Sequence, residues 1–116
     1  MKVDHFSFGS IRVDGTTFDH DLVIDQGRVR KRAKGPSKKL RARYGHTPLS
    51  AAEEIPWDCD RLIIGTGADG ALPVTEDVVE EARKRGVRIT QMPTADAIGE
   101  LRHAGARTNA ILHVTC

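Results

Sequence analysis

The chain has 116 residues, of which 39% are hydrophobic and 29% charged, as in an ordinary globular protein of one domain. No apolar run reaches the roughly 18 residues that a membrane-spanning helix needs, so composition excludes an integral membrane helix. The N-terminal sequence MKVDHFSFGS places an acid and a histidine where a signal peptide has its apolar core, and we therefore expect a cytoplasmic protein.

Half of the basic residues lie in one segment of the chain. Residues 28–43, RVRKRAKGPSKKLRAR, contain nine of the eighteen lysines and arginines and no acid, so the remaining chain carries nine basic against sixteen acidic residues, or −7. A block of this kind is typical of a solvated arm or of a contact surface for an anionic partner. Its centre, Gly35-Pro36-Ser37, indicates a turn.

The first thirty residues predict an antiparallel β meander. Apolar and polar residues alternate there, Asp14-Gly15 is a strong hairpin signal, and a second turn is expected at Gln26-Gly27. After the basic segment, Ser50 and Glu53 have the spacing of a capping box and predict a short helix that ends at Pro56.

The second half of the chain predicts a β-α-β-α-β unit. Helix signals are clear at both ends of TEDVVEEARKRG, which has a capping threonine, acids in the first turn, bases in the last turn and a final glycine. Its buried face is expected to contain Val78, Val79 and Ala82. We expect strands over residues 62–64, 87–90 and 110–115, and helices that begin at Thr75 and Thr94 and end before Gly86 and Gly105.

These elements predict a single α/β domain over residues 1–116. Strands joined by helices must be parallel, so the fold is a three-layer domain whose central mixed sheet contains the β-α-β-α-β unit, with the meander added. Within it we distinguish the meander over residues 1–30, a basic segment over residues 31–45 and an α/β part over residues 46–116.

The sequence GTGADG, residues 65–70, matches the G-x-G-x-x-G spacing of dinucleotide-binding loops. Three features argue against a dinucleotide: residues 71–74 separate the glycines from the helix, the next strand has no acid at its end, and the chain has no room for a second nucleotide-binding half. We predict no cofactor, and a glycine-rich turn is the simpler interpretation.

The edge of the predicted sheet is a candidate crevice for a small anionic ligand. Ligands of open α/β sheets bind at the carboxyl ends of the parallel strands, where helix N-termini also point. Thr75 and Thr94 can however cap their own helices. The candidate crevice consists of Gly65, Thr66, Gly67, Ala68, Gly70, Thr94, His113 and Thr115.

His113 and Cys116 invite a metal or catalytic interpretation, which strand geometry disfavours. Residues three apart in a strand point to opposite faces, so we predict no metal site. Cys116 is also the last residue of the sequence, where a neighbouring carboxylate would disfavour a nucleophilic thiolate. With Cys59, it makes no zinc framework, and both are expected to be thiols in a reducing compartment.

The basic segment predicts a second candidate surface, for an anion or a partner. Nucleic acid would require aromatic residues that stack on bases, and only Tyr44 is near, so an acidic protein is the preferred partner and nucleic acid the alternative. His46 could face a ligand in the adjoining loop. The surface consists of Arg30, Lys31, Arg32, Lys34, Lys38, Lys39, Arg41, Arg43 and His46.

The order of motifs resembles the Mth-domain family. The resemblance is carried by FSFGSIRVDGTTFDHD, by Gly45-His46-Thr47-Pro48, by RLIIGTGADGALPVTEDVVEEARKRGVRI and by the C-terminal LHVTC, and it covers nearly the whole chain. It implies a single three-layer domain with a central mixed sheet and no established activity or cofactor. The family includes an adipogenesis-associated protein and a mitochondrial complex I assembly factor, and the latter implies an assembly or adaptor role.

The leading functional hypothesis is a non-enzymatic binding, adaptor or assembly-factor-like protein. It depends on the basic segment and on the absence of a clear catalytic constellation in the sequence. One alternative is a small-molecule binding protein or enzyme that uses the GTGADG crevice, and a second is nucleic-acid binding through the basic segment. The sequence predicts no reaction, substrate or oligomeric state.

Overall fold

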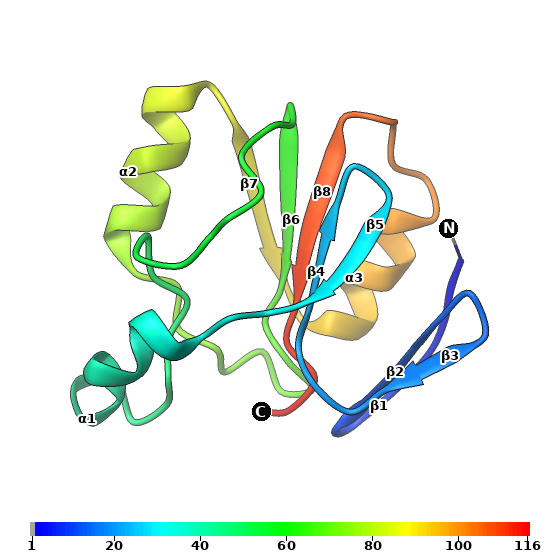
Figure 1. The fold of residues 1–116 in the computed structure, drawn as a ribbon, viewed down its shortest axis with the longest axis horizontal. Coiled ribbons are helices and arrows are strands. Elements are labelled where there is room, and N and C mark those ends of the chain that lie inside the picture. Colours follow the sequence, from blue (N-terminus) through cyan, green and yellow to red (C-terminus); the bar gives the residue numbers. More distant parts are fainter. Residues whose placement is uncertain (1) are drawn as a thin grey trace.

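The structure, a computed structural model, describes residues 2–116 as an α/β domain with a five-stranded central sheet between two layers (Figure 1). The strands are β1 (Val3–Ser7), β2 (Ser10–Val13), β3 (Thr16–Phe18), β4 (Leu22–Asp25), β5 (Arg28–Lys31), β6 (Arg61–Gly65), β7 (Arg88–Met92) and β8 (Thr108–Leu112). The helices are the 3₁₀ helix η1 (Gly35–Leu40) and the α-helices α1 (Arg41–Tyr44), α2 (Glu76–Arg85) and α3 (Thr94–Leu101).

The central sheet is mixed and has the strand order β5-β4-β8-β6-β7. Strand β6 is parallel to both β7 and β8, as the β-α-β-α-β pattern predicts, whereas β4 pairs antiparallel with both β5 and β8. The predicted fold class, a three-layer α/β domain with a mixed sheet and an antiparallel meander, is confirmed.

The predicted meander is shorter than residues 1–30. Strands β1, β2 and β3 form a separate antiparallel sheet, but β4 leaves it and pairs with β8, so that Leu22 lies opposite Leu112. Both predicted hairpin turns are present, between β2 and β3 and between β4 and β5. Asp14 and Gly15 have φ of 49° and 81°, the left-handed geometry that matches the twist of paired strands.

The two longer helices cover opposite faces of the sheet, and each buries its own core. Helix α2 packs with residues such as Leu62, Ile64 and Ile111, whereas α3 and the meander pack with Ile63 and Leu112. Because β7 and β8 lie on opposite sides of β6, the two crossovers run in opposite directions, and right-handed connections then place their helices on opposite faces.

The boundaries of α2 follow the sequence signals. Thr75 occupies the N-cap position with extended backbone, but its hydroxyl donates to the Asp77 carboxylate and caps no backbone N–H. Gly86 ends the helix at a φ of 68°, where its N–H donates to the last turn. Val79 was expected in the buried face, but 37% of its surface is exposed, because the buried stripe of this short helix contains only Val78 and Ala82.

The helix expected around Ser50 and Glu53 is absent, and that prediction was wrong. Residues 50–60 form turns and irregular backbone, whereas the basic segment, expected to turn at Gly35-Pro36-Ser37, starts the 3₁₀ helix η1 there and continues into α1. Proline near the start of η1 suits the fixed φ of a first helical turn. Within residues 2–116, no helix has the length and apolar character to cross a membrane.

Candidate functional site

The glycine loop holds the C-terminal segment of its own chain. The N–H of Ala68 donates to the carbonyl oxygen of Thr115 at 2.8 Å, and the N–H groups of Asp69 and Ala71 donate to the main-chain oxygen of Cys116 at 3.1 and 3.0 Å. These are the donors that would cradle a phosphate in a nucleotide-binding loop. In this fold they stabilise residues 113–116.

Gly67 must be glycine for this arrangement. Its φ is 104°, and an added Cβ would lie 2.3 Å from the carbonyl carbon of Cys116 and 2.3 Å from the carbonyl oxygen of Thr115. The loop and the C-terminal segment therefore pack backbone against backbone, with no space for a side chain.

Thr94 joins the loop to the C-terminal segment instead of capping its helix. Its hydroxyl donates to the carbonyl oxygen of His113 at 2.6 Å and accepts the N–H of Gly67 at 2.9 Å. Pro93 occupies the N-cap of α3, so the expectation that Thr94 caps this helix was wrong. The candidate crevice residues do lie together at the sheet edge, but these polar groups already bond one another.

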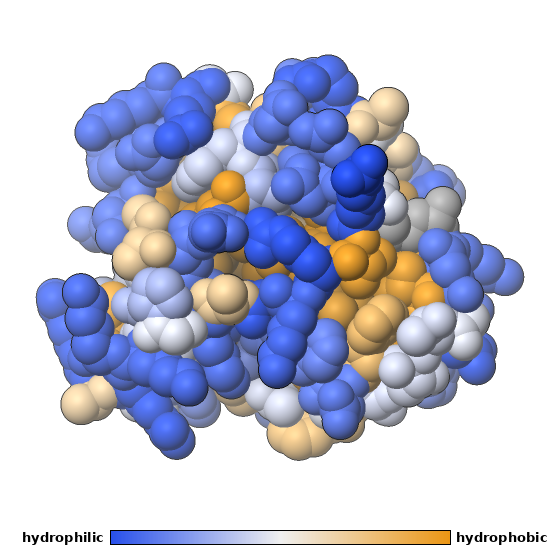
Figure 2. Space-filling model, viewed as in Figure 1, coloured by the Kyte–Doolittle hydropathy of each residue, from blue (hydrophilic) through white to orange (hydrophobic). Residues whose placement is uncertain are grey.

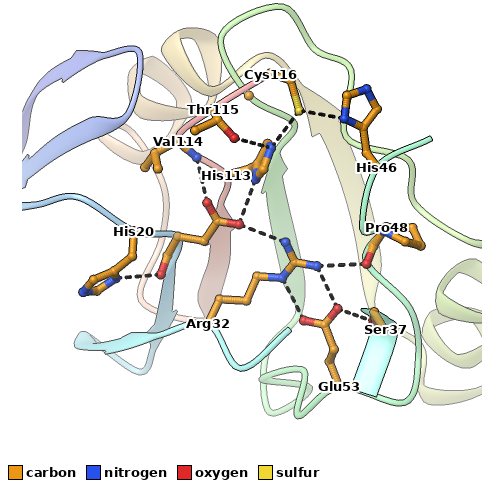
Figure 3. Close-up of polar contacts among 12 residues, drawn as sticks. His20, Arg32, Ser37, His46, Pro48, Glu53, His113, Val114, Thr115 and Cys116 are labelled. Carbon is orange, nitrogen blue, oxygen red and sulfur yellow. Dashed lines mark hydrogen bonds and ion pairs between the residues drawn. The ribbon is translucent and has the colours of Figure 1, made fainter. Parts of the chain in front are cut away.

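Next to this edge lies a buried cluster of charged and polar side chains centred on Arg32 (Figure 3). The guanidinium donates to both carboxylate oxygens of Glu53 at 2.8 Å, to Asp21 Oδ2 at 2.9 Å and to the carbonyl oxygen of Pro48 at 2.9 Å. Only 1% of the Arg32 side chain is exposed. Arg32 was predicted to lie on an anion or partner surface; its charge instead serves two carboxylates of the same chain.

Two serines complete the Glu53 side of this buried cluster. Ser37 Oγ donates to Glu53 Oε2 at 2.5 Å and lies 2.6 Å from Ser50 Oγ. Because the single proton of Ser37 is given to Glu53, the Ser50 hydroxyl donates to Ser37. The Ser50 and Glu53 spacing, which predicts a capping box, thus reflects contacts to Arg32 and Ser37, which lie far away in the sequence.

Asp21 connects Arg32 to His113. Its Oδ2 accepts from Arg32 and lies 2.8 Å from His113 Nδ1, while its Oδ1 accepts the N–H of Val114 at 2.9 Å. Burial by itself would raise the pKa of Asp21. The hydrogen bond and charge of His113, together with hydrogen bonds from the Val114 N–H and from Arg32, outweigh it and lower this pKa to about 2. Nothing in the sequence around Asp21 marked it for this role.

The ionised Asp21 determines which nitrogen of His113 donates to it. A carboxylate only accepts hydrogen bonds, so Nδ1 carries a proton, and in the neutral form of the ring Nε2 is the nitrogen with the lone pair. This Nε2 lies 3.1 Å from Cys116 Sγ and 3.2 Å from Thr115 Oγ1. The ring therefore has a carboxylate on one side and a thiol on the other (Figure 3).

The prediction that His113 and Cys116 point apart was wrong. It assumed that the last strand continues through residue 115, but β8 ends at Leu112, and the irregular backbone after it brings both side chains together. A second imidazole approaches from the loop after α1, where His46 Nδ1 lies 3.6 Å from Cys116 Sγ. Cys116 thus lies between two histidines.

A pocket of about 200 Å³ opens at this point, and we call it the C-terminal pocket. It unites members of both predicted residue sets, because His113 and Thr115 belong to the crevice and the basic residues to the partner surface. No aspartate or glutamate is among its lining residues. These are Arg32, Lys34, Arg41, His46, Thr47, His113, Thr115 and Cys116.

The other predicted basic residues lie away from this pocket. Arg30 donates to the carbonyl oxygen of Glu54 at 2.8 Å, and the Arg43 guanidinium lies 5.6 Å from the Tyr44 ring centroid. Lys38 and Lys39 are exposed on η1, where hydrophilic residues predominate at the lower left of Figure 2. The strand residue Lys31 is exposed as well.

Cys59, the second free thiol, lies in a different environment from Cys116. It is buried in the core under α2, its thiol donates to the carbonyl oxygen of Pro56 at 3.5 Å, and burial raises its pKa. Within residues 2–116, no three side chains of histidine, cysteine, aspartate or glutamate are grouped so that they could hold a metal ion.

Comparison with solved structures finds the same fold over the whole chain. A conserved hypothetical protein from Pyrococcus horikoshii OT3 is 29% identical, with 100% of both chains covered and a TM-score of 0.83. The protein MT938 is 31% identical over 99% of this chain and 98% of its own, with a TM-score of 0.73. A Bordetella pertussis protein described as a Mth938-like domain shares the fold at 21% identity, over 97% of this chain and 85% of its own, with a TM-score of 0.63.

The family model for proteins of unknown function DUF498/DUF598 matches residues 3–113. The resemblance to the Mth-domain family is thereby confirmed, together with its lack of an assigned activity. The chain belongs to the DUF498/DUF598 family of proteins of unknown function.

Proposed function

We propose that this protein binds a small anionic molecule in the C-terminal pocket. The observation that supports the proposal is the lining, which contains the cations Lys34 and Arg41 and two imidazoles and no aspartate or glutamate side chain. Clefts lined by one sign of charge attract ligands of the opposite sign. The proposal moves the predicted ligand site from the glycine loop to the far side of residues 113–116.

Lys34 and Arg41 are the cations available to such a ligand. The charge of Arg32 is balanced by Asp21 and Glu53. Within residues 2–116, no carboxylate lies within ion-pair distance of Lys34 or Arg41. Both side chains can therefore bind a carboxylate or phosphate of a ligand without first breaking an internal ion pair.

The volume of the pocket limits the ligand. Pockets for drug-sized molecules have roughly 300–1,000 Å³, so a space of about 200 Å³ suits a phosphate, a short dicarboxylate or the anionic end of a longer molecule. Hydroxyls of Thr47 and Thr115 line the same space and can accept or donate hydrogen bonds.

The test is isothermal titration calorimetry with inorganic phosphate, sulfate and succinate at low ionic strength. We expect at least one of the three to bind, and the double variant Lys34→Gln/Arg41→Gln to weaken its binding about tenfold or more, because charge-assisted hydrogen bonds contribute about 1.5–3 kcal/mol. The matched control is Lys38→Gln/Lys39→Gln. It removes the same charge from the same basic segment but outside the pocket, and it should change affinity by less than about twofold.

Equal losses in the two double variants would show a general effect of charge and contradict a specific pocket. No heat with any of the three anions, at concentrations up to the solubility of each salt, would contradict the proposal itself.

A second candidate function is the adaptor role predicted from the sequence. The observation that favours it is the exposed basic surface of Lys38, Lys39 and Arg43 on η1 and α1, which suits an acidic protein segment. Binding of fluorescent poly-glutamate that is lost in Lys38→Gln/Lys39→Gln would support it. Tighter binding of an oligonucleotide, falling steeply with salt, would instead favour nucleic acid.

The expected cytoplasmic location suits both functions. A reducing compartment keeps Cys116 as a free thiol beside the pocket, whereas oxidation would change the chemistry of the lining. Mass spectrometry of the protein alkylated inside intact cells would test this, with unmodified thiols before alkylation as the expected result.

A further inference from the structure

We infer that Cys116 is a nucleophile for acyl transfer, with His113 as its general base and Asp21 as the group that orients His113. The inference rests on the proposed function for the class of substrate, which is a small anionic ester or thioester bound in the C-terminal pocket. It adds a reaction to a site for which binding alone was proposed.

The geometry is that of a nucleophile, a base and an orienting carboxylate in series. Cys116 Sγ lies 3.1 Å from His113 Nε2, and His113 Nδ1 lies 2.8 Å from Asp21 Oδ2. These contacts connect opposite nitrogens of one ring, so the thiol proton can move to Nε2 while Nδ1–H keeps its bond to Asp21. The same arrangement of roles recurs on unrelated folds.

The buried cluster around Arg32 holds this series in place. Arg32 donates to Asp21 Oδ2 and Val114 N–H donates to Oδ1, so the carboxylate that orients His113 is itself fixed by two donors. Asp21, Glu53 and Arg32 together carry a net charge of −1, because two carboxylates share one guanidinium. This charge stabilises the imidazolium that forms when His113 accepts the thiol proton.

The reacting atoms can be reached from the pocket. Cys116 and His113 both line it, and Cys116 is partly exposed. His46 Nδ1, at 3.6 Å from the sulfur, is a second imidazole that can donate to a thiolate. Cys59 has a buried thiol that donates to a carbonyl, so the chain contains an internal reference thiol.

The chemical step balances without a cofactor. His113 Nε2 takes the proton of Cys116, the thiolate adds to the carbonyl carbon of the substrate, and a sulfur–carbon bond forms. The bond from that carbon to the leaving alcohol or thiol then breaks, and the leaving group takes the proton from His113. Water, deprotonated by the same nitrogen, attacks the resulting thioester, releases the acid and restores the Cys116 thiol.

The first test measures alkylation by iodoacetamide at neutral pH, followed for each cysteine by mass spectrometry. We expect Cys116 of the native wild type to react at least about tenfold faster than Cys116 of the same chain unfolded in guanidinium, and Cys59 to react more slowly than when unfolded. This comparison needs no variant, so it does not depend on whether a variant folds. A native Cys116 that is no faster than the unfolded one would overturn the inference.

Variants then assign the roles. His113→Gln should remove the rate advantage of Cys116, and Asp21→Asn should reduce it, in proteins whose circular dichroism confirms folding. With 4-nitrophenyl acetate, we expect a burst of one nitrophenolate per chain and an acetyl group on Cys116. An acetyl group on another residue, or a burst unchanged by His113→Gln in folded protein, would overturn the inference.

The same assay separates this inference from the proposed function. Iodoacetate carries a negative charge and iodoacetamide does not, so a cationic pocket raises the rate with iodoacetate relative to iodoacetamide. Loss of this preference in Lys34→Gln/Arg41→Gln would support the anion pocket. If the wild type shows no preference for iodoacetate but its alkylation still depends on His113, the anion pocket is contradicted. The role of Cys116 as a nucleophile is then still supported.

Discussion

Arg32 and its neighbours in the basic segment have the same chemistry and opposite environments. Arg32 is buried and bonded to Asp21, Glu53 and Pro48, whereas Lys38 and Lys39, six and seven residues later, are exposed on η1. A run of basic residues is therefore not one surface. One of its members organises the interior and the others remain available to partners.

The difference shows how a single buried cation can determine the path of a loop. Residues 46–56 contain no helix or strand, yet Pro48, Ser50 and Glu53 all turn inward to Arg32 and Ser37. The carbonyl of Pro48 is satisfied by Arg32, whereas the backbone of Leu49 bonds to Pro73 and Thr75. The bonds of Arg32 also position Asp21, which connects this cluster to the C-terminal pocket.

Removing the buried cation Arg32 should have the largest effect on the free energy of unfolding. Arg32→Met leaves the Asp21 and Glu53 carboxylates buried without their partner and should lower the free energy of unfolding by about 3–5 kcal/mol. The control Lys39→Met removes an exposed cation and should change it by less than about 0.5 kcal/mol. Urea unfolding measures both. Similar losses in the two variants would remove the distinction between the two environments.

The glycine loop packs against the backbone of Thr115 and Cys116, and Gly67→Ala tests this packing. The new Cβ would meet the backbone of Cys116 and Thr115 at a strained φ, so we expect a loss of about 2–3 kcal/mol and slower alkylation of Cys116. A glycine-to-valine change here, a natural test of a ligand crevice, could not leave the fold intact. Gly99→Ala is the control, because it meets no atom within 4 Å in a helix and should stabilise by about 0.5–1 kcal/mol.

Acid should destabilise the fold through the buried cluster. The pKa of Asp21 is about 2 in the folded protein, against an ordinary value of 3.8. Ionisation of Asp21 therefore stabilises the fold at pH values above 3.8. This contribution, about 2 kcal/mol, is lost as pH falls from about 4 to 2. Thermal unfolding over that range should show a smaller pH dependence in Asp21→Asn than in wild type; parallel curves would contradict the assignment.

His46 lies at the border between the two environments and should give the smallest effect. It approaches Cys116 at 3.6 Å, farther than His113, and among residues 2–116 no carboxylate bonds to it. We expect His46→Asn to slow alkylation of Cys116 by about twofold to threefold, with the free energy of unfolding unchanged within about 0.5 kcal/mol. A loss as large as that of His113→Gln would make His46 the principal base.

Local signals in the sequence predicted most of the fold. The hairpin turn at Asp14-Gly15, the boundaries of α2 and the parallel β6-β7 pair all depend on neighbouring residues or on connection length. The transfer of β4 to the central sheet depends on its pairing with β8, nearly ninety residues away in the sequence. Such pairing leaves no periodicity that a local pattern can detect.

The candidate site was predicted only in part for the same reason. His113, Thr115 and His46 were selected from their positions near strand ends and loops, but they were assigned to two separate surfaces. Asp21, more than ninety residues before His113, carries no local signal. A reactive Cys116 was not predicted, because a strand was expected to continue through residue 115 and a carboxylate was expected to disfavour the thiolate. Contacts between distant segments decide which of these side chains meet.

The strand order also affects how the basic segment can be studied. Strand β5 is one edge of the central sheet, and it presents Arg28, Arg30 and Lys31 where an unpaired edge could otherwise recruit a strand from another molecule. Neutralising residues 28–43 together would therefore expose that edge to self-association. It would also remove the cation of the buried cluster and the positive charges of the exposed basic surface. Solubility, folding and partner binding would then fail at once, and only substitutions made one or two at a time can tell these failures apart.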